Sequence, residues 1–306
     1  MFPPPSLLLY PNRLVSTVNV GDTPLGLALS PMGNALYVAN YNSGSMTVVR
    51  TADCTVIRTV EVGFSPDGIA VTPNGEHVYV GCYQSIAVTD TVDNRVVRQI
   101  SSGHCRLTDA TGSPSGEHIY MTAYLPTDFP TSGVLIVRTQ SDTIEGTIPV
   151  SGDPWSIVVS PNGRDAYVAG GAGRFVAVVD LASRQIVTQI PSSSTPVALA
   201  VSANGDYVYV ACNGGAVERI ATGSNSVDHT AILGQDLRDI AVLASGDWVY
   251  VSDATSDCVY VLNSTDLSVA DSVPVGRRPE NLAVHPNDYF VYVGNTEDNT
   301  VSVIGQ

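Results

Sequence analysis

The sequence predicts an all-β fold, a seven-bladed β-propeller with four antiparallel strands in each blade. Its clearest feature is a tyrosine that recurs seven times, at steps of 42, 41, 47, 42, 41 and 42 residues. These tyrosines are Tyr37, Tyr79, Tyr120, Tyr167, Tyr209, Tyr250 and Tyr292. A period near 40 with several short strands per repeat is typical of a propeller, in which each repeat forms one blade.

Four short runs rich in Val, Ile, Ala and Tyr fit into one repeat, bounded by turn signals such as Pro-x-Gly and Asn-Gly. In the second repeat we expect strands at Gly68–Thr72, His77–Gly81, Ile86–Thr89 and Val96–Ile100, from the axis outward. No segment has a persuasive helical period, so a strand is predicted throughout.

The last repeat ends after its third strand, Thr300–Ile304, and lacks a fourth. The segment Arg13–Val20 precedes the first repeat and matches the outermost-strand pattern of other repeats. We therefore expect residues 13–20 to complete the last blade and close the ring, which leaves no incomplete sheet at the junction. Residues 1–306 then form a single domain, with 1–12 as an N-terminal extension.

The repeated phrases, among them PLGLALSPMGNALYVAN and PWSIVVSPNGRDAYVAG, resemble the YVTN family of seven-bladed propellers. The likeness covers nearly all of residues 13–306. It implies the fold but no single activity, because that family and related propellers include lactonase-like enzymes, lyases, dehydrogenase subunits and cell-surface proteins. Function must therefore be argued from the site.

Composition excludes several classes of function. The net charge is −15, which argues against a nucleic-acid partner because phosphate binding requires a concentrated basic surface. All 14 basic residues are arginine, so chemistry that requires a lysine nucleophile or a pyridoxal phosphate Schiff base is excluded. No P-loop, dinucleotide fingerprint or metal-ligand spacing is present, and we predict no cofactor and no metal.

The first residues, MFPPPSLLLYPNR, have no basic leader and only a short apolar run. We expect no membrane span and a cytoplasmic protein, with export as the alternative if a signal has been removed. The five cysteines, Cys54, Cys82, Cys105, Cys212 and Cys258, show no ligand spacing and are expected to be reduced thiols. The sequence does not indicate the oligomeric state.

The start of each innermost strand is predicted to form the rim of an axial funnel, where propellers commonly bind ligands. We define two rim positions, which follow the recurrent proline or the residue that replaces it. The first rim position holds, in blade order, Leu25, Asp67, Thr108, Trp155, Val197, Arg238 and Glu280. The second holds Gly26, Gly68, Asp109, Ser156, Ala198, Asp239 and Asn281.

Blades 3 and 6 depart most from the repeat, and local rules tend to be broken where function demands it. Both replace the proline with leucine. Blade 3 gains His104, Arg106 and Asp109, and blade 6 gains Arg238 and Asp239. Because these blades are nearly opposite in a ring of seven, we expect their polar groups to face each other across the funnel.

Three residues are predicted to move protons: His104, Asp109 and Asp239. Arg106 and Arg238 are predicted to hold an anionic or carbonyl oxygen of the substrate. The other predicted substrate-binding residues are Trp155, Tyr83, Tyr124, Phe129, Glu280, Asn281 and Tyr41. Two alternatives stay open, in which the aspartates pair with these arginines as a structural belt or join Glu280 around a divalent ion.

Blade 3 also contains the longest repeat, and its extra residues fit the segment TAYLPTDFPTSG after the second strand. This loop would open on the funnel face and could act as a lid, although surface loops also tolerate ordinary insertions. Tyr41, Tyr83 and Tyr124 occupy comparable positions in blades 1 to 3 and would form an aromatic arc on the rim.

Three hypotheses for function follow. The favoured one is a cofactor-free enzyme that acts on a small organic molecule by acid–base chemistry, such as lactone or ester hydrolysis, elimination, or cyclisation and isomerisation. The alternative is a non-catalytic propeller that binds a ligand or presents its rim to a protein. The third is an exported surface or adhesion repeat protein, in which all blades should be alike, so the individually altered blades 3 and 6 favour the enzyme. The acidic, Ser/Thr-rich loops show no apolar stretch that would favour the protein-binding scaffold.

Overall fold

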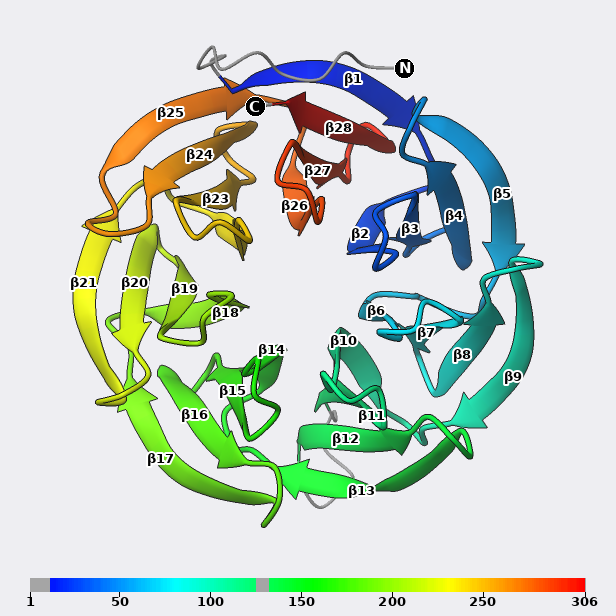
Figure 1. The fold of residues 1–306 in the computed structure, drawn as a ribbon, viewed down its shortest axis with the longest axis horizontal. Helices are drawn as coiled ribbons and strands as arrows, with labels where there is room; N and C mark the ends of the chain where they lie inside the picture. Colours follow the sequence, from blue (N-terminus) through cyan, green and yellow to red (C-terminus); the bar gives the residue numbers. More distant parts are fainter. Residues whose placement is uncertain (1–11, 125–131, 306) are drawn as a thin grey trace.

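A computed structural model describes residues 12–124 and 132–305. In this part of the chain seven four-stranded antiparallel sheets stand around a central axis as the blades of a propeller (Figure 1). The predicted fold class is therefore confirmed. The observed strands begin and end within a few residues of the predicted ones.

The strands run from the axis outward in chain order within each blade. Blade 1 contains β2 (Pro24–Leu29), β3 (Ala35–Asn40), β4 (Ser45–Arg50) and β5 (Thr55–Glu61). Blade 2 contains β6 (Ile69–Val71), β7 (His77–Cys82), β8 (Ser85–Asp90) and β9 (Arg95–Ser101). Blade 3 contains β10 (Arg106–Gly112), β11 (His118–Tyr124), β12 (Gly133–Arg138) and β13 (Thr143–Pro149). Blade 4 contains β14 (Pro154–Val159), β15 (Asp165–Gly170), β16 (Phe175–Asp180) and β17 (Gln185–Pro191).

The second half of the ring follows the same order. Blade 5 contains β18 (Thr195–Val201), β19 (Tyr207–Asn213), β20 (Ala216–Ala221) and β21 (Ser226–Ile232). Blade 6 contains β22 (Leu237–Val242), β23 (Trp248–Asp253), β24 (Cys258–Asn263) and β25 (Val269–Pro274). Blade 7 contains β26 (Pro279–Val284), β27 (Phe290–Asn295), β28 (Thr300–Gly305) and β1 (Arg13–Asn19).

The ring is closed by the N-terminal strand, as the repeat pattern predicts. Strand β1 pairs antiparallel with β28, from Arg13 opposite Gly305 to Asn19 opposite Thr300 (Figure 1). The last blade thus combines strands from the two ends of the chain. This pairing gives blade 7 the same four strands as its neighbours, so no blade presents a half-finished sheet.

The apolar core is divided among the seven junctions between blades. Each junction contains its own cluster of buried side chains contributed by two adjacent blades. The recurrent tyrosines lie in these clusters and are at most 5% exposed. Three of their hydroxyls donate hydrogen bonds, those of Tyr79, Tyr209 and Tyr250; Tyr79, for example, donates to Asp142 in the next blade at 2.6 Å. Their recurrence is therefore explained by packing between blades.

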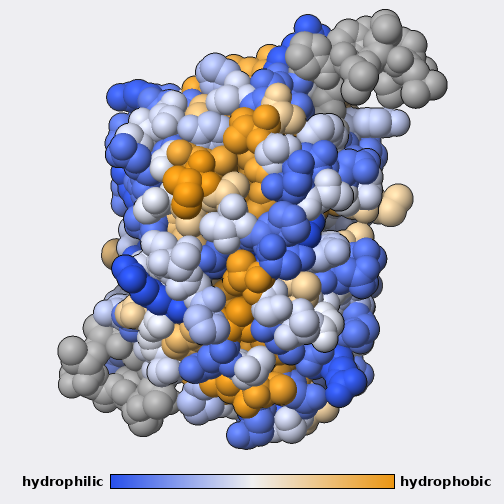
Figure 2. All heavy atoms as spheres, turned by 90° about the vertical axis from the view of Figure 1, so that its left-hand side faces the viewer, coloured by the Kyte–Doolittle hydropathy of each residue, from blue (hydrophilic) through white to orange (hydrophobic). Residues whose placement is uncertain are grey.

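The outer surface of the propeller, formed by the outermost strands, carries both apolar and hydrophilic residues (Figure 2). Figure 2 shows an apolar band among hydrophilic residues on the side that carries blades 5 and 6. Val187, Ile232 and Val269, on the outer strands of blades 4 to 6, are all more than half exposed. Among the described residues no helix has the length and hydropathy needed to cross a bilayer.

Most innermost strands contain a β-bulge where they begin. The register shifts between Pro154 and Ile157 in β14, between Pro279 and Leu282 in β26, and at matching points in β2, β10, β18 and β22. A bulge leaves a residue unpaired and re-aims the neighbouring side chains. Here the bulge includes the rim positions, and the backbone N–H that follows the second rim position bonds to a side chain of the preceding blade, as in Ile157, Leu199 and Leu282.

Candidate functional site

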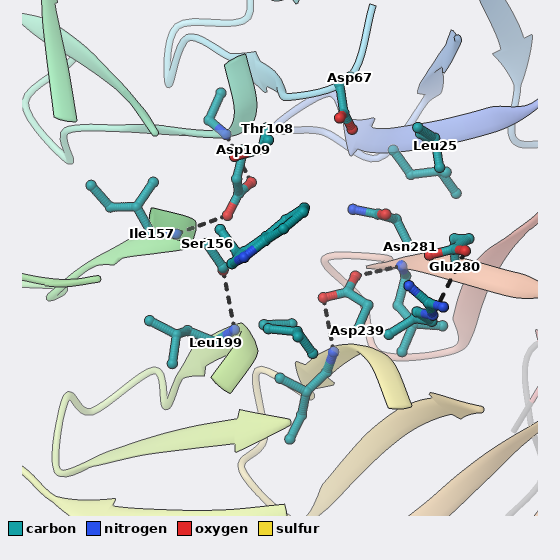
Figure 3. Close-up of a pocket in the computed structure, with 18 of the residues that line it drawn as sticks. Leu25, Asp67, Thr108, Asp109, Ser156, Ile157, Leu199, Asp239, Glu280 and Asn281 are labelled. Carbon is teal, nitrogen blue, oxygen red and sulfur yellow. Dashed lines mark hydrogen bonds and ion pairs between the residues drawn. The ribbon is translucent and has the colours of Figure 1, made fainter. Parts of the chain in front are cut away.

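An axial cavity of about 650 Å³ opens at the start of the innermost strands. Figure 3 shows Asp67, Asp109, Asp239 and Asn281 around this space. All seven residues of the first rim position line it: Leu25, Asp67, Thr108, Trp155, Val197, Arg238 and Glu280. The alignment of repeats thus identifies cavity-lining positions, although it does not by itself establish what they do.

The two predicted aspartates join neighbouring blades. The backbone N–H of Ile157 in blade 4 donates to Oδ2 of Asp109 in blade 3 at 2.9 Å, and Asp109 also accepts the N–H of Ala110. In the same way Asp239 of blade 6 accepts the N–H of Leu282 in blade 7 at 2.7 Å and that of Ile240 at 2.8 Å (Figure 3). Each carboxylate therefore satisfies two backbone donors beside a bulge.

In blade 4 the residue at the second rim position, Ser156, also accepts a backbone hydrogen bond from the next blade. There the hydroxyl of Ser156 accepts the N–H of Leu199 in blade 5 at 3.1 Å. Asp109 and Asp239 each follow a blade with no side-chain acceptor at this position, namely Gly68 and Ala198. An aspartate can supply acceptors to its own blade and to the next, which gives a structural reason for these two departures from the repeat.

Blades 1 to 3 approach one another without such bridges. A Cβ at Gly26 would lie 1.9 Å from the backbone oxygen of Asp67, and one at Gly68 would lie 2.6 Å from the backbone carbon of Asp109. The missing side chains allow the innermost strands of these blades to come this close. In blades 1 and 2 the second rim position is glycine, because the backbone of the next blade lies too close for a side chain. In blades 3, 4 and 6 it is a side chain that accepts a backbone hydrogen bond from the next blade.

The arginines pair with carboxylates other than those expected. Arg106 contacts Asp67 of blade 2, with 2.9 Å between Nη2 and Oδ2, and not Asp109. Arg238 contacts Asp236 at 2.7 Å and lies 3.8 Å from Glu280, and Arg278 contacts Glu280 at 3.1 Å. The alternative of a belt made by the two aspartates with Arg106 and Arg238 is therefore wrong, because both guanidiniums are taken up by other carboxylates.

Four carboxyl groups in the cavity have raised pKa values, and burial is the main cause in each. Burial raises the pKa of Asp109 to about 6 against the hydrogen bonds from Ile157, Ser156 and Ala110, which lower it. It raises the pKa of Asp239 to about 7, with a further increase from Asp109 and Glu280. Burial also raises the pKa of Asp67 to about 7, although Arg106 opposes it, and raises that of Glu280 against Arg238 and Arg278.

Seven of the predicted site residues line the cavity, and four described ones do not. The lining includes Arg106, Asp109, Trp155, Arg238, Asp239, Glu280 and Asn281. His104 is exposed outside it, with its Nδ1 2.8 Å from Nε2 of Gln84. Tyr41, Tyr83 and Tyr124 are also outside the lining, although the Tyr41 ring lies 5.3 Å from the guanidinium of Arg106. Phe129 and most of the predicted lid loop fall outside the described residues.

Asp67 and Arg278 line the cavity, but neither is among the residues predicted to move protons or bind the substrate. The signal for Asp67 is its first rim position, which it shares with Trp155, Arg238 and Glu280. Its nearness to Arg106 is not visible in the sequence, because the pair joins two blades.

The geometry does not favour a metal ion. In residues 12–124 and 132–305, no three His, Cys, Asp or Glu side chains converge closely enough to hold one. The alternative of a divalent ion between Asp109, Asp239 and Glu280 therefore has no support from the positions of these groups.

The fold and the cavity define a seven-bladed β-propeller with a polar, partly aromatic axial cavity. No family model and no curated protein matches the chain. The structure is similar to a solved chain of hydrazine synthase from Kuenenia stuttgartiensis, with a TM-score of 0.84 and 21% sequence identity. The match covers 94% of this chain and 97% of that chain. At this identity the similarity establishes the shared fold alone.

Proposed function

We propose that this propeller is a cofactor-free enzyme that binds a small organic molecule in the axial cavity and acts on it by acid–base chemistry. The observation that carries the proposal is the pair Asp109 and Asp239, which line one cavity and have pKa values of about 6 and about 7. Near neutral pH each carboxyl can therefore give up or accept a proton, as a general acid or base must.

The hydrogen bonds to these aspartates support a positioned catalytic pair. Each carboxylate is fixed by two backbone N–H groups, so its remaining lone pairs keep a defined direction. The Nε–H groups of Arg106 and Arg238 are buried and have no acceptor among the described residues. Because both guanidiniums are already neutralised by carboxylates, they suit a neutral carbonyl oxygen of a substrate better than a second anion.

The reaction would be hydrolysis of a lactone or ester, an elimination, or a cyclisation or isomerisation, each of which requires a proton donor and acceptor. Membership of the YVTN family and a cytoplasmic location are further parts of this proposal. His104 stays a predicted proton carrier, but its exposed position beside Gln84 gives it no part in the argument from the cavity.

A second candidate is a propeller that binds its ligand without turnover. It is favoured by the bridging role of Asp109 and Asp239, because a structural task already accounts for both carboxylates. The two candidates differ in whether the carboxyl group itself is needed once the bridge between blades is kept.

A double variant separates these roles. Asp239→Ser removes the carboxyl but leaves one hydroxyl to serve two backbone N–H groups. Adding Ala198→Ser supplies an acceptor from blade 5 for the N–H of Ile240, as Ser156 does for Leu199. We expect the double variant to fold and to keep the junctions between blades 5, 6 and 7 bonded.

The test is untargeted mass spectrometry of a metabolite extract of the source organism after incubation with purified protein. Wild type is expected to convert at least one compound, and Ala198→Ser/Asp239→Ser to convert it at least about a hundredfold more slowly. Ala198→Ser alone is the matched control for the hydroxyl added at this lining position, and it should convert the compound at least about a hundredfold faster than the double variant. Conversion at the wild-type rate by the double variant, or no conversion by any protein, contradicts the enzyme.

A further inference from the structure

The charges around the cavity are not balanced. Three guanidiniums line it, those of Arg106, Arg238 and Arg278, and all three contact carboxylates. Their partners are Asp67, Asp236 and Glu280. Three positive charges are thus matched by three negative ones.

Asp109 and Asp239 are the two lining carboxylates outside these pairs. In the part of the chain that the structure describes, neither forms an ion pair, and both accept hydrogen bonds from neutral backbone N–H groups. These bonds orient the carboxylates but leave their charge uncompensated. When both are ionised, the cavity carries about two negative charges with no cation beside them, an arrangement that favours a positively charged ligand.

The walls suit an organic cation better than a metal ion. No three acidic, His or Cys side chains converge in residues 12–124 and 132–305, so the coordination sphere of a metal ion is lacking. Instead the lining includes the indole of Trp155 and the apolar side chains of Leu25 and Val197. An indole face attracts a cationic head group, and the aliphatic residues can cover the apolar part of the same molecule.

The whole chain favours the same sign of ligand. With a net charge of −15, the protein attracts cations toward its surface and repels anions. A cavity that contains an unpaired negative charge within an acidic protein therefore discriminates against carboxylate and phosphate ligands both on approach and on binding.

We propose that the axial cavity binds an organic cation, a protonated amine that carries a planar apolar group. Its ammonium would lie between Asp109 and Asp239, and its planar group would lie against Trp155. The inference rests on the cavity being the ligand site of the proposed function, and it does not depend on turnover.

Three probes of similar shape and different charge test this proposal by ligand-detected NMR titration at about pH 8, where the carboxyl groups are ionised and the amine is still protonated. They are phenethylamine, 2-phenylethanol and 3-phenylpropanoate. We expect the amine to bind at least about tenfold more tightly than the alcohol, and the carboxylate to bind most weakly. In Asp109→Ser and in Ala198→Ser/Asp239→Ser the amine should lose at least about tenfold in affinity while the alcohol is unaffected.

Asp180→Ser is the control for overall charge, since it removes one acidic side chain at the end of β16, outside the cavity lining. It should leave the affinity for the amine unchanged. Equal binding of the three probes, no binding of any probe, or an equal loss in Asp180→Ser would overturn the inference. Amine binding that depends on the aspartates, without any turnover, would support this inference and contradict the proposed enzyme. Turnover of a neutral or anionic compound, without a preference for the amine, would support the enzyme and contradict this inference.

Discussion

The carboxylate of Asp239 accepts the backbone N–H of Leu282 at 2.7 Å and so links blade 6 to blade 7 at the mouth of the cavity. Its second oxygen accepts the N–H of Ile240 at 2.8 Å. The preceding blade has Ala198 at the corresponding position, which cannot supply an acceptor. The carboxylate of Asp239 therefore supplies two acceptors, one for the next blade and one that Ala198 of the preceding blade cannot supply. This relationship leads to the first prediction.

Replacement of Asp239 should destabilise the fold according to how many acceptors are lost. Asp239→Ala leaves two backbone N–H groups without a partner, and we expect a loss of about 2 to 4 kcal/mol in the free energy of unfolding. Asp239→Ser should lose about 1 kcal/mol, and Ala198→Ser/Asp239→Ser should recover most of that loss. Urea denaturation measures all three. If adding Ala198→Ser gives no recovery, the proposed acceptor exchange between blades is wrong.

The ion pair between Arg106 and Asp67 should matter more than a surface pair. Asp67 is only 7% exposed, and the two groups join blades 2 and 3. Arg106→Met leaves this carboxylate without a cation, and we expect a loss of roughly 2 to 3 kcal/mol, below that of a wholly buried pair because Arg106 is partly exposed. Adding Asp67→Asn should restore part of the stability. A double variant less stable than Arg106→Met would contradict this coupling.

The small residues at the junctions of blades 1 to 3 should not tolerate a side chain. Gly26→Ala brings a Cβ to 1.9 Å from the backbone oxygen of Asp67, so the blades must move apart. We expect a loss of about 3 kcal/mol or more, seen as a lower midpoint of thermal unfolding. Gly223→Ala is the matched control, since no atom lies within 4 Å of its added Cβ, and should change stability by no more than about 0.5 kcal/mol. Similar midpoints for the two variants would be inconsistent with the tight junction.

The stability that Asp239 contributes should depend on pH. Its pKa of about 7 in the folded protein is above the value of about 3.9 for an unfolded aspartate, so the folded state binds more protons between these values. Its contribution is therefore fully present below about pH 4 and is lost as the pH rises to about 7. Burial is the main cause of the raised pKa of Asp239, and the negative charges of Asp109 and Glu280 add to it. Glu280 itself lies 3.8 Å from Arg238 and 3.1 Å from Arg278.

The measurement compares wild type with Ala198→Ser/Asp239→Ser by urea denaturation over this range. The stability of wild type minus that of the variant should fall with rising pH, by at most about 1.4 kcal/mol per pH unit. Glu145 has a pKa lowered to about 2, chiefly by its hydrogen bond to Arg138, and contributes with the opposite sign, but it is present in both proteins. A difference that stays constant or rises with pH would exclude a protonated Asp239 in the folded state.

Much of the candidate site could be predicted because the repeats provide their own alignment. Counting one residue past the recurrent proline, or past the leucine that replaces it, identifies positions such as Trp155, Arg238 and Glu280, which line the cavity. The prediction for His104, which lies in the linker before β10, was less successful, because this residue is outside the cavity lining. A linker residue has no strand pairing to fix its direction, so its place in the repeat does not determine where its side chain points.

The sequence by itself determined the blades, their number and their closure by residues 13–20, because these depend on local strand patterns and on a repeat period. Only the tertiary structure decided which side chains meet across blades. Arg106 pairs with Asp67, and Asp109 accepts the N–H of Ile157, because the innermost strands converge at the axis and their bulges leave backbone donors that a side chain of the preceding blade satisfies. Such contacts depend on how whole blades pack, and no spacing within one repeat specifies them.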